Sequence, residues 1–300
     1  MKRVVECVPN FSEGRDASVV QSIIDSIAGA EVRVLASESD PDHNRSVITF
    51  AGEPSHVVEA AFRAVAKAAE TIDLTRQSGV HPRIGAADVV PIVPLRNITL
   101  EECAALAHAL GERIWRDLHI PVYFYEAAAL RPERKRLEVV RRGGFEALRV
   151  TNAPDRQPDV GGPGLHPTAG AVAIGARKIL LAFNINLATT DITIAQQIAV
   201  KIRASSGGLP HVKAMGVPLE SRGLAQVSMN LTDFEVTPLR TVFDAVRAEA
   251  HLRGVEIAGS EIIGLMPERA LDEALAKYLL CENFSQDSIL ERRLETLLID

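Results

Sequence analysis

The sequence predicts an α/β (α+β) protein of two subdomains, each with the element order β-α-β-β-α-β, which is the split-βαβ or ferredoxin-like order. Apolar strand-like runs alternate with segments whose apolar residues recur at helical spacing, and this order begins in each half of the 300-residue chain. A glycine- and proline-rich loop, residues 154–170, separates the halves. We expect an N-terminal subdomain over 1–175 that ends in this loop, a C-terminal subdomain over 176–300, and a ligand cleft between them.

The elements of the first half follow from apolar periodicity and from residues that start helices. Thr99 and Glu102 have the spacing of a capping box, which predicts a helix start. Pro54 is expected to open a long helix, because proline is favoured in a first helical turn. The predicted elements are, in order, a strand at 3–8, a helix at 16–27, strands at 32–36 and 47–51, a helix at 54–72, a strand at 89–93, a helix at 99–117 and a strand at 121–125.

The second half repeats the order. Thr190 and Asp191 are expected to cap its first helix, and Thr237 is expected to cap a helix whose first residue is Pro238. The predicted elements are, in order, a strand at 178–183, a helix at 190–204, strands at 212–219 and 224–229, a helix at 237–253, a strand at 255–265, and helices at 267–280 and 288–298.

Composition narrows the class of protein. The net charge of −6 argues against a nucleic-acid partner, and the mixed charges of Arg131–Arg142 indicate a solvated helix face. No apolar run reaches the roughly 18 residues of a membrane span, and the first residues turn polar too early for a secretory signal, so we expect a cytoplasmic protein. Cys7, Cys103 and Cys281 are odd in number and far apart, which predicts core residues rather than a disulfide framework.

Residues 78–88 form a polar segment directly before an apolar strand, a place where sites are common. His81 can both take and give a proton near neutral pH. Arg83 can bind a carboxylate as a planar fork, while Gly85 frees the backbone and Asp88 adds a carboxylate. On the residues alone, a structural turn in which His81 caps a backbone group remains open.

A second polar segment runs from Glu38 to Arg45. Asp40, Asp42 and His43 are ligand types that bind metals, but the sequence is also typical of a polar turn or of substrate contacts. All three interpretations stay open from the residues.

Asparagines recur where strands are predicted to end, at Asn10, Asn184, Asn186 and Asn230. An amide offers a donor and an acceptor, which suits a heterocycle that presents both. Asparagine is also a common turn residue, so neither interpretation is excluded. The chain has no glycine-rich nucleotide fingerprint and no nucleophile elbow.

Five segments together resemble the glutamate formimidoyltransferase (formiminotransferase) family, and they cover nearly the whole chain in the family's order. These segments are Val5–Gly14, Asp40–Arg45, His81–Ala86, Arg177–Leu187 and Leu224–Phe234. The resemblance implies two α/β subdomains, a homodimer, and substrates that lie between the subdomains. It implies transfer of the formimino group from N-formimino-L-glutamate to N5 of tetrahydrofolate in histidine degradation, with tetrahydrofolate as co-substrate and no metal. We expect the cyclodeaminase domain of animal relatives to be absent.

The resemblance also assigns residues. The family's catalytic histidine falls on His81, and a family carboxylate falls on Glu38, where relatives often have aspartate. The folate-contacting loop falls on residues 161–170, where animal relatives carry bulky aromatic residues. The residues expected to bind substrate or folate are Asn10, Arg45, Arg83, Gly85, Asp88, Gly161, Gly162, Pro163, Gly164, Leu165, His166, Pro167, Thr168, Ala169, Gly170, Asn184, Asn186 and Asn230.

Three other functions stay open at this stage. An enzyme of the same scaffold could act on 5-formyltetrahydrofolate with ATP-dependent cyclisation, although the chain lacks a phosphate loop. A non-catalytic folate- or amino-acid-binding module would have the same fold, because fold alone does not decide function. A metal hydrolase would use Asp40, Asp42 and His43.

Overall fold

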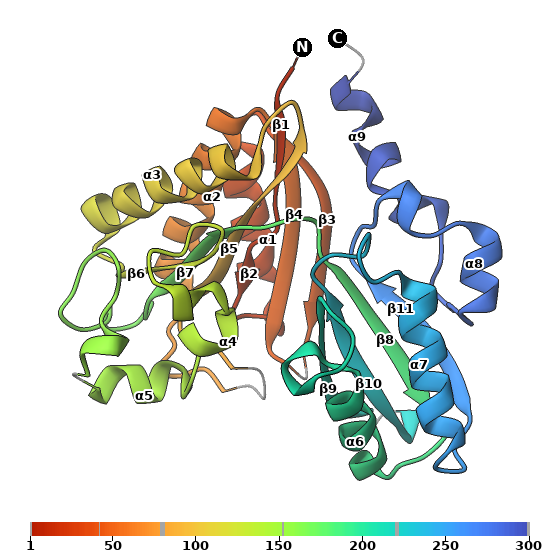
Figure 1. The fold of residues 1–300 in the computed structure, drawn as a ribbon. Coiled ribbons are helices and arrows are strands. Elements are labelled where there is room, and N and C mark those ends of the chain that lie inside the picture. The colour runs from red at the N-terminus through yellow and green to blue at the C-terminus, as the bar shows by residue number, and fades with distance from the viewer. Residues whose placement is uncertain (1, 42, 79–81, 152, 220–221, 299–300) are drawn as a thin grey trace. The chain divides into compact units, whose positions relative to one another are not determined.

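The structure is a computed structural model that describes residues 2–41, 43–78, 82–151, 153–219 and 222–298. The described chain is a mixed α/β protein with two sheets, which confirms the predicted fold class (Figure 1). It forms two compact units that divide between Arg177 and Lys178. We call them unit 1 and unit 2 and describe each by itself.

Unit 1 is built on a seven-stranded sheet with the path β1-β4-β2-β5-β7-β6, in which β3 pairs with β4 and β1 also pairs with β5. The strands β5, β1, β4 and β3 have the neighbour order of a ferredoxin-like sheet. The elements are β1 Val4–Cys7, β2 Asn10–Phe11, α1 Ala17–Ala28, β3 Arg33–Asp40, β4 Arg45–Gly52, α2 Pro54–Thr71, β5 Ala87–Arg96, α3 Leu100–Leu118, β6 Val122–Glu126, a 3-10 turn Pro132–Lys135, α4 Leu137–Val140, α5 Gly144–Val150, a 3-10 turn Pro154–Arg156 and β7 Val172–Ala176.

The helix starts of unit 1 follow their sequence signals. Thr99 and Glu102 form both hydrogen bonds of the capping box at the start of α3, as predicted. Asp16 caps α1, because its carboxylate accepts from the backbone amides of Ser18 and Val19. These caps fix where α1 and α3 begin.

Two hydrophobic clusters cover the two faces of the sheet. The larger joins α1, α2 and α3 to one face through residues such as Phe11, Phe50 and Ile92. The smaller joins α4 and α5 to the strands β5, β6 and β7 through Val140 and Leu148. The part of the second face that belongs to β3, β4 and β2 contributes no side chain to the smaller cluster.

The arginine-rich segment 131–142 differs from its prediction as a solvated helix face. Arg134 is 2% exposed and ion-pairs with Asp159 at 2.6 Å between Nη1 and Oδ1. Arg141 ion-pairs with the fully buried Asp88. The prediction is wrong for these two residues, because their carboxylate partners come from distant parts of the chain.

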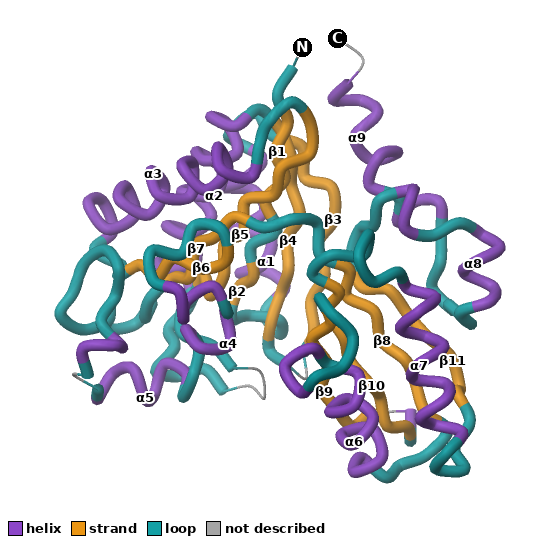
Figure 2. The backbone as a smooth tube through the Cα atoms, in the orientation of Figure 1, coloured by secondary structure: helices purple, strands orange, loops and turns teal. Residues whose placement is uncertain are grey.

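Unit 2 contains a four-stranded antiparallel sheet in the order β11-β8-β10-β9, which is the ferredoxin-like order. Figure 2 shows these strands together, with α6 and α7 against them. The elements are β8 Leu181–Leu187, α6 Ile192–Ile202, a 3-10 turn Ala204–Ser206, β9 Val212–Leu219, β10 Leu224–Leu231, α7 Leu239–His251, β11 Ile257–Ile263, a 3-10 turn Glu268–Ala270, α8 Glu273–Tyr278, a 3-10 turn Gln286–Ser288 and α9 Leu290–Leu298.

Three expectations for unit 2 are corrected. The N-cap of α7 is Pro238, without a side-chain cap, since the Thr237 hydroxyl donates to the Pro210 carbonyl at 2.6 Å instead. The helix predicted over 267–280 is a 3-10 turn followed by the shorter α8. The strands predicted to end at 183 and 229 continue to Leu187 and Leu231. Within the described residues, no helix combines the length and apolar character needed to cross a bilayer.

Candidate functional site

Two segments that the sequence singled out meet in unit 1. The backbone of Gly85 bridges that of Gly170, and the Ala86 amide donates to the Ala169 carbonyl at 2.9 Å. The Leu74 amide donates to the Thr168 carbonyl at 2.9 Å. The loop 161–170 is therefore bonded to both flanks of the segment that carries His81. His81 itself lies outside the described residues, so its assignment stays a prediction.

Glycine is required where these segments touch. A Cβ on Gly85 would lie 1.9 Å from the Ala171 carbonyl oxygen, and one on Gly170, with φ of +71°, would lie 2.2 Å from the Ile84 oxygen. Gly164 also has a positive φ, but a Cβ there meets nothing within 4 Å. Close backbone approach thus explains Gly85 and Gly170 but not Gly164.

Hydrogen bonds hold the second half of the loop 161–170, whereas most residues of its first half are exposed. His166 and Gly170 exchange backbone hydrogen bonds of 2.9 and 3.1 Å, and His166 Nδ1 accepts from the Ala169 amide at 3.0 Å. Burial, with a smaller contribution from His119, lowers the pKa of His166, which favours the neutral ring that this acceptor role needs. Of the remaining loop residues, Gly162, Leu165 and Thr168 are half-buried, Ala169 is buried, and Gly161, Pro163, Gly164 and Pro167 are exposed.

Arg83 spans the base of the His81 segment. Its Nη2 donates to the Gln77 carbonyl at 2.6 Å and to the Leu74 carbonyl at 3.5 Å. Its Nη1 pairs with Glu146 at 3.2 Å, and its own carbonyl accepts from the Phe145 amide at 2.7 Å. The guanidinium therefore bonds the protein itself at both Nη atoms, and only the buried Nε has no partner among the described residues.

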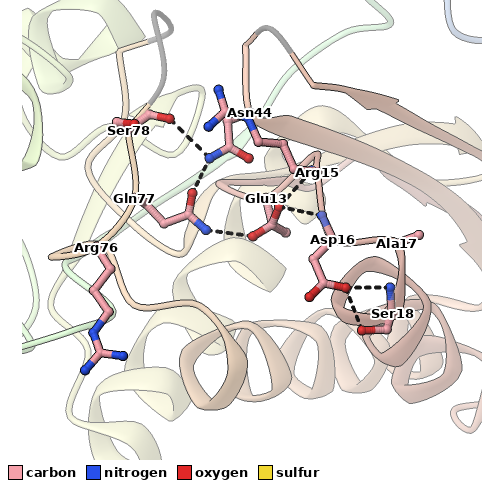
Figure 3. A pocket seen from close by; sticks show the side chains of 9 residues that line it. All are labelled: Glu13, Arg15, Asp16, Ala17, Ser18, Asn44, Arg76, Gln77 and Ser78. Atoms are coloured by element: carbon pink, nitrogen blue, oxygen red, sulfur yellow. Dashed lines mark hydrogen bonds between the residues drawn. The ribbon is translucent and has the colours of Figure 1, made fainter.

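A chain of side chains holds the residues just before His81 (Figure 3). Asn44 Nδ2 donates to the Gln77 side-chain oxygen and to the Ser78 carbonyl, and Gln77 Nε2 donates to Glu13 at 2.6 Å. Asn44 Oδ1 accepts from the Gly14 amide at 3.0 Å. This chain borders a pocket of about 590 Å³ beside the start of α1. The pocket is lined by Glu13, Arg15, Asp16, Ala17, Ser18, Asn44, Arg76, Gln77 and Ser78.

A buried charge cluster joins three predicted site residues from three strands. Arg45 on β4 donates to Asn10 Oδ1 on β2 at 2.8 and 3.0 Å and to Asp88 Oδ2 on β5 at 2.9 Å. Arg141 also bonds Asp88 Oδ2, and the Ile84 amide donates to Asp88 Oδ1 at 2.9 Å. The sequence placed Asn10, Arg45 and Asp88 in the site, and the structure brings them together. The sequence analysis did not predict Arg141 as a site residue, because no neighbouring residue indicated such a role.

The cluster of Asn10, Arg45, Asp88 and Arg141 carries an excess positive charge. Burial raises the pKa of Asp88, but the charges of Arg141 and Arg45 together with the Ile84 amide outweigh it and leave the pKa below its usual value. Burial, with the Arg141 charge, lowers the pKa of Arg45 to about 10, so both partners are ionised at neutral pH. Two guanidinium groups share one carboxylate, and the buried Arg141 Nε has no partner in the described chain. Such a cluster favours an anionic ligand.

Glu38 is exposed on β3. It lies opposite Val47 on β4, which lies opposite Asn10 on β2. Residues directly opposite in antiparallel pairs share a sheet face, so Glu38 and Asn10 lie on one face, two strands or roughly 10 Å apart. Of the proposed metal ligands in this segment, Asp40 and His43 ion-pair with each other at 2.6 Å, and Asp42 lies outside the described residues.

Glu6 on β1 is a buried carboxyl that sequence reasoning missed. Burial, opposed by the Arg177 charge, raises the pKa of Glu6 to about 7. An acid inside the apolar run Val4–Cys7 was an available signal, because such residues are rarely fully buried without a reason.

Polar side chains also gather on one face of the unit 2 sheet. Asn184, Asn186 and Asn230 were expected at strand ends, but they lie inside β8 and β10, at positions that alternate with core residues. Gln226 and Glu261 join Asn184 and Asn186 through side-chain hydrogen bonds and were not predicted. Their signal was an acid or amide at alternate positions of an otherwise apolar strand.

Comparison with known proteins identifies the family. Residues 4–177 match the N-terminal subdomain of the formiminotransferase domain, and residues 182–297 match the formiminotransferase domain. The chain is 46% identical to glutamate formimidoyltransferase of Streptococcus pyogenes serotype M1 over 98% of this chain and 99% of that one. It is 46% identical to glutamate formimidoyltransferase of Thermoplasma acidophilum, covering 97% of each.

A longer relative shows the same domain in another setting. Formimidoyltransferase-cyclodeaminase of Mus musculus is 43% identical over 93% of this chain, which spans 53% of the mouse protein. Both units of the chain match their family models, and the two relatives at 46% identity align with nearly the full length of the chain. The chain belongs to the formiminotransferase family.

Proposed function

We propose that the protein is a glutamate formimidoyltransferase, which moves the formimino group from N-formimino-L-glutamate to N5 of tetrahydrofolate. The observation that carries the proposal is the 46% identity over nearly the full length of two relatives that bear this name. The excess positive charge around Asp88 supports it, because the donor substrate is an anion with two carboxylates.

The reaction forms one carbon–nitrogen bond and breaks another. N5 of tetrahydrofolate attacks the amidine-like formimino carbon and gives a tetrahedral adduct. The bond from that carbon to the glutamate nitrogen then breaks, and glutamate leaves as an amine. N5 loses a proton and the departing nitrogen gains one, so a single imidazole can carry both transfers.

His81 is the proposed proton carrier. A positioned imidazole of this kind contributes about 10²–10⁴-fold to the rate. Its flanks are held by Arg83 and by the Asn44–Gln77 pair, which supports a role that depends on position. Holding the two substrates in line contributes as well, since orientation supplies several kcal/mol of the barrier. No covalent intermediate with the enzyme is needed.

Arg45 and Arg141 are the proposed anchors of a substrate carboxylate. Both guanidinium groups donate to Asp88 Oδ2. Asn10 Oδ1 accepts a further hydrogen bond from Arg45 and so holds the orientation of its guanidinium group. Arg83 is less suited to this role, because Gln77, Leu74 and Glu146 already bond both of its Nη atoms. The carboxylate of Glu38, on the same sheet face as Asn10, is proposed to stabilise positive charge on the formimino group.

The decisive experiment mixes the protein with formiminoglutamate and tetrahydrofolate under reducing, anaerobic conditions and follows 5-formiminotetrahydrofolate optically. Turnover is expected from the wild-type protein, and its absence would contradict the proposal. His81→Ala is expected to lower kcat by about 10²–10⁴-fold while leaving thermal stability unchanged. His251→Ala, on the exposed end of α7, is the matched control.

Arg45→Lys separates substrate binding from chemistry. A lysine keeps the charge but loses the fork, so KM for formiminoglutamate is expected to rise roughly tenfold while KM for tetrahydrofolate stays constant. Arg142→Lys changes an exposed neighbour of the cluster and should alter neither constant.

We also propose that the protein acts in the cytoplasm as a homodimer, as the family resemblance implies. Light scattering on the purified protein is expected to give twice the mass of one chain. A mass of one chain at assay concentration would contradict the dimer.

A further inference from the structure

Four polar side chains form a patch on the unit 2 sheet, on the face opposite α6 and α7. Gln226 on β10 lies opposite Asn186 on β8, and Glu261 on β11 lies opposite Asn184 on β8. Residues directly opposite in antiparallel strands share a face, so the four side chains point the same way. The alternate residues of β8, such as Phe183 and Ile185, point into the hydrophobic core instead. We call these four residues the amide–carboxylate patch.

Hydrogen bonds fix the geometry of the patch. Gln226 Nε2 donates to Asn186 Oδ1 at 2.8 Å and to Glu261 Oε1 at 2.9 Å, and Asn184 Nδ2 donates to the same Glu261 oxygen at 3.2 Å. Two amides thus hold one oxygen of the carboxylate. The second oxygen, Oε2, receives no hydrogen bond from any residue that the structure describes.

One hydrogen-bond donor in the patch also lacks an acceptor among the described residues. Asn186 is fully buried, and its Nδ2 has no hydrogen-bond partner within the described part of the chain. A buried amide donor without an acceptor is rare in folded proteins and calls for an explanation. A ligand acceptor at this point would provide one. The patch therefore presents a charged acceptor at Glu261 and a neutral donor at Asn186.

This pattern distinguishes between the two proposed substrates. N-formimino-L-glutamate carries two carboxylates, which Glu261 would repel. The pterin ring of tetrahydrofolate ends in a 2-amino-4-oxopyrimidine edge, where N3–H and the 2-amino group donate and the 4-oxo group accepts. A carboxylate that receives hydrogen bonds from this edge, beside an amide that donates to the oxygen, complements it group by group.

We propose that Glu261 recognises the pterin ring, accepting hydrogen bonds from the 2-amino and N3–H groups while Asn186 donates to the 4-oxo oxygen. Asn184 and Gln226 act as positioning residues that hold the carboxylate. The inference rests on the proposed function for its choice of ligand, and it makes Glu261 the residue that sets specificity for the folate.

The test compares two ligands that differ only at the recognised edge. Binding of tetrahydrofolate and of its 2-desamino analogue is measured by calorimetry, under reducing and anaerobic conditions, to the wild-type protein and to Glu261→Gln. The wild type is expected to prefer tetrahydrofolate by about tenfold or more, because a site that pairs a polar group rejects the analogue lacking it. Glu261→Gln should bind both ligands equally. Glu256→Gln, which changes an exposed acid just before β11, should keep the preference.

Kinetics separates this inference from the proposed function. In Glu261→Gln, KM for tetrahydrofolate is expected to rise about tenfold while KM for formiminoglutamate stays unchanged. Unaltered binding and kinetics in that variant would overturn the inference and leave the transferase standing. Selective binding of tetrahydrofolate without any transfer by the wild type would overturn the transferase and leave the pterin patch standing.

A second variant covers the case in which Glu261→Gln does not fold. Glu261→Asp keeps the charge and withdraws the carboxylate by one methylene. It is expected to lose more affinity for tetrahydrofolate than for the 2-desamino analogue, which retains only the N3–H donor. Equal losses for both ligands would overturn the inference, because the carboxylate would then act only on the fold. Guanosine serves as a further ligand with the same edge, and binding as tight as that of tetrahydrofolate would contradict a pterin site.

Discussion

The guanidinium of Arg83 donates a 2.6 Å hydrogen bond to the backbone carbonyl of Gln77. A side chain that follows His81 by two positions is thereby tied to the backbone four positions before it. The same Nη2 reaches the Leu74 carbonyl, and Nη1 reaches Glu146 on α5. The side chain of Arg83 thus connects the two ends of the segment that carries His81.

Arg83→Lys tests whether this residue holds the segment or binds substrate. A lysine keeps the charge but cannot bond Gln77, Leu74 and Glu146 together, so kcat should fall roughly tenfold with KM for formiminoglutamate unchanged. Steady-state kinetics with both substrates makes the measurement. A rise in KM at constant kcat would instead assign Arg83 to the substrate. Arg116→Lys, at an exposed position of α3, is the control.

Asn44→Asp removes one donor from the other support of the His81 segment. Asn44 has a φ of +48°, which aspartate also tolerates, and the variant keeps the oxygen that accepts from Gly14. The bonds to Gln77 and Ser78 are lost, so kcat should fall about fivefold to tenfold, with both KM values retained. Asn97→Asp is a close control, because Asn97 also has a positive φ and donates to a backbone carbonyl. Equal loss of activity in both variants would exclude a specific role for Asn44.

Glu6→Gln should make stability less dependent on pH. Burial raises the pKa of Glu6 to about 7, so between about pH 4.5 and 7 the folded chain binds more protons than the unfolded chain. The contribution of Glu6 is therefore fully present at low pH and is lost as pH rises through 7, at a cost of about 3 kcal/mol. Urea unfolding is expected to show Glu6→Gln more stable than wild type at pH 8 and equal to it at pH 4.5. A constant difference across this range would contradict the assignment.

Asp88→Asn should destabilise unit 1. The variant leaves Arg45 and Arg141 close together without the buried carboxylate that they share, and breaking such a pair costs about 3–5 kcal/mol. Since the pKa of Asp88 lies below its usual value, its contribution persists above the pKa of the unfolded chain and is lost as pH falls through the folded value. Thermal unfolding at pH 7 measures the loss. Asp117→Asn removes an exposed ion-paired acid and should leave the melting temperature nearly unchanged, because solvent screens such a pair.

Gly85→Ala and Gly164→Ala differ in what the new methyl group meets. At Gly85 it would lie 1.9 Å from the backbone oxygen of Ala171, the residue directly before β7, so we expect a loss of soluble folded protein. At Gly164 it meets nothing within 4 Å, and only the positive φ opposes it, at a cost of about 1–2 kcal/mol. Expression and thermal melting compare the two. A folded, stable Gly85→Ala protein would show that the contact between Gly85 and loop 161–170 is not required.

The sequence predicted the long elements well, because their signals are local. Helices α2 and α3 have apolar residues at helical spacing and clear starts at Pro54 and Thr99. The order of unit 2 followed from the same periodicity. Strand β7 was not predicted, since the segment Val172–Ala176 is short, has no alternation of apolar and polar residues, and pairs only with strands far away in sequence.

Prediction of the site succeeded where a residue type itself indicates chemistry. Asn10, Arg45 and Asp88 come from three separate segments and meet in one cluster. Arg141 was assigned to solvent because its neighbours are charged and its partner, Asp88, is 53 positions away. Glu261 and Gln226 were missed because the strand pairing that aligns them with Asn184 and Asn186 depends on register, which the sequence of a single strand does not reveal.

The position of β7 has a consequence for the order in which unit 1 is completed. β7 is the last strand of unit 1 to be synthesised, yet it lies between β5 and β6, and β6 pairs with no other strand in the described sheet. While the ribosome is still making residues 127–171, β6 therefore has no place in the sheet. The loop 161–170, which bonds Gly85 and Ala86, directly precedes β7 in the chain. The backbone contacts of Gly85 thus depend on a segment synthesised more than eighty residues after it.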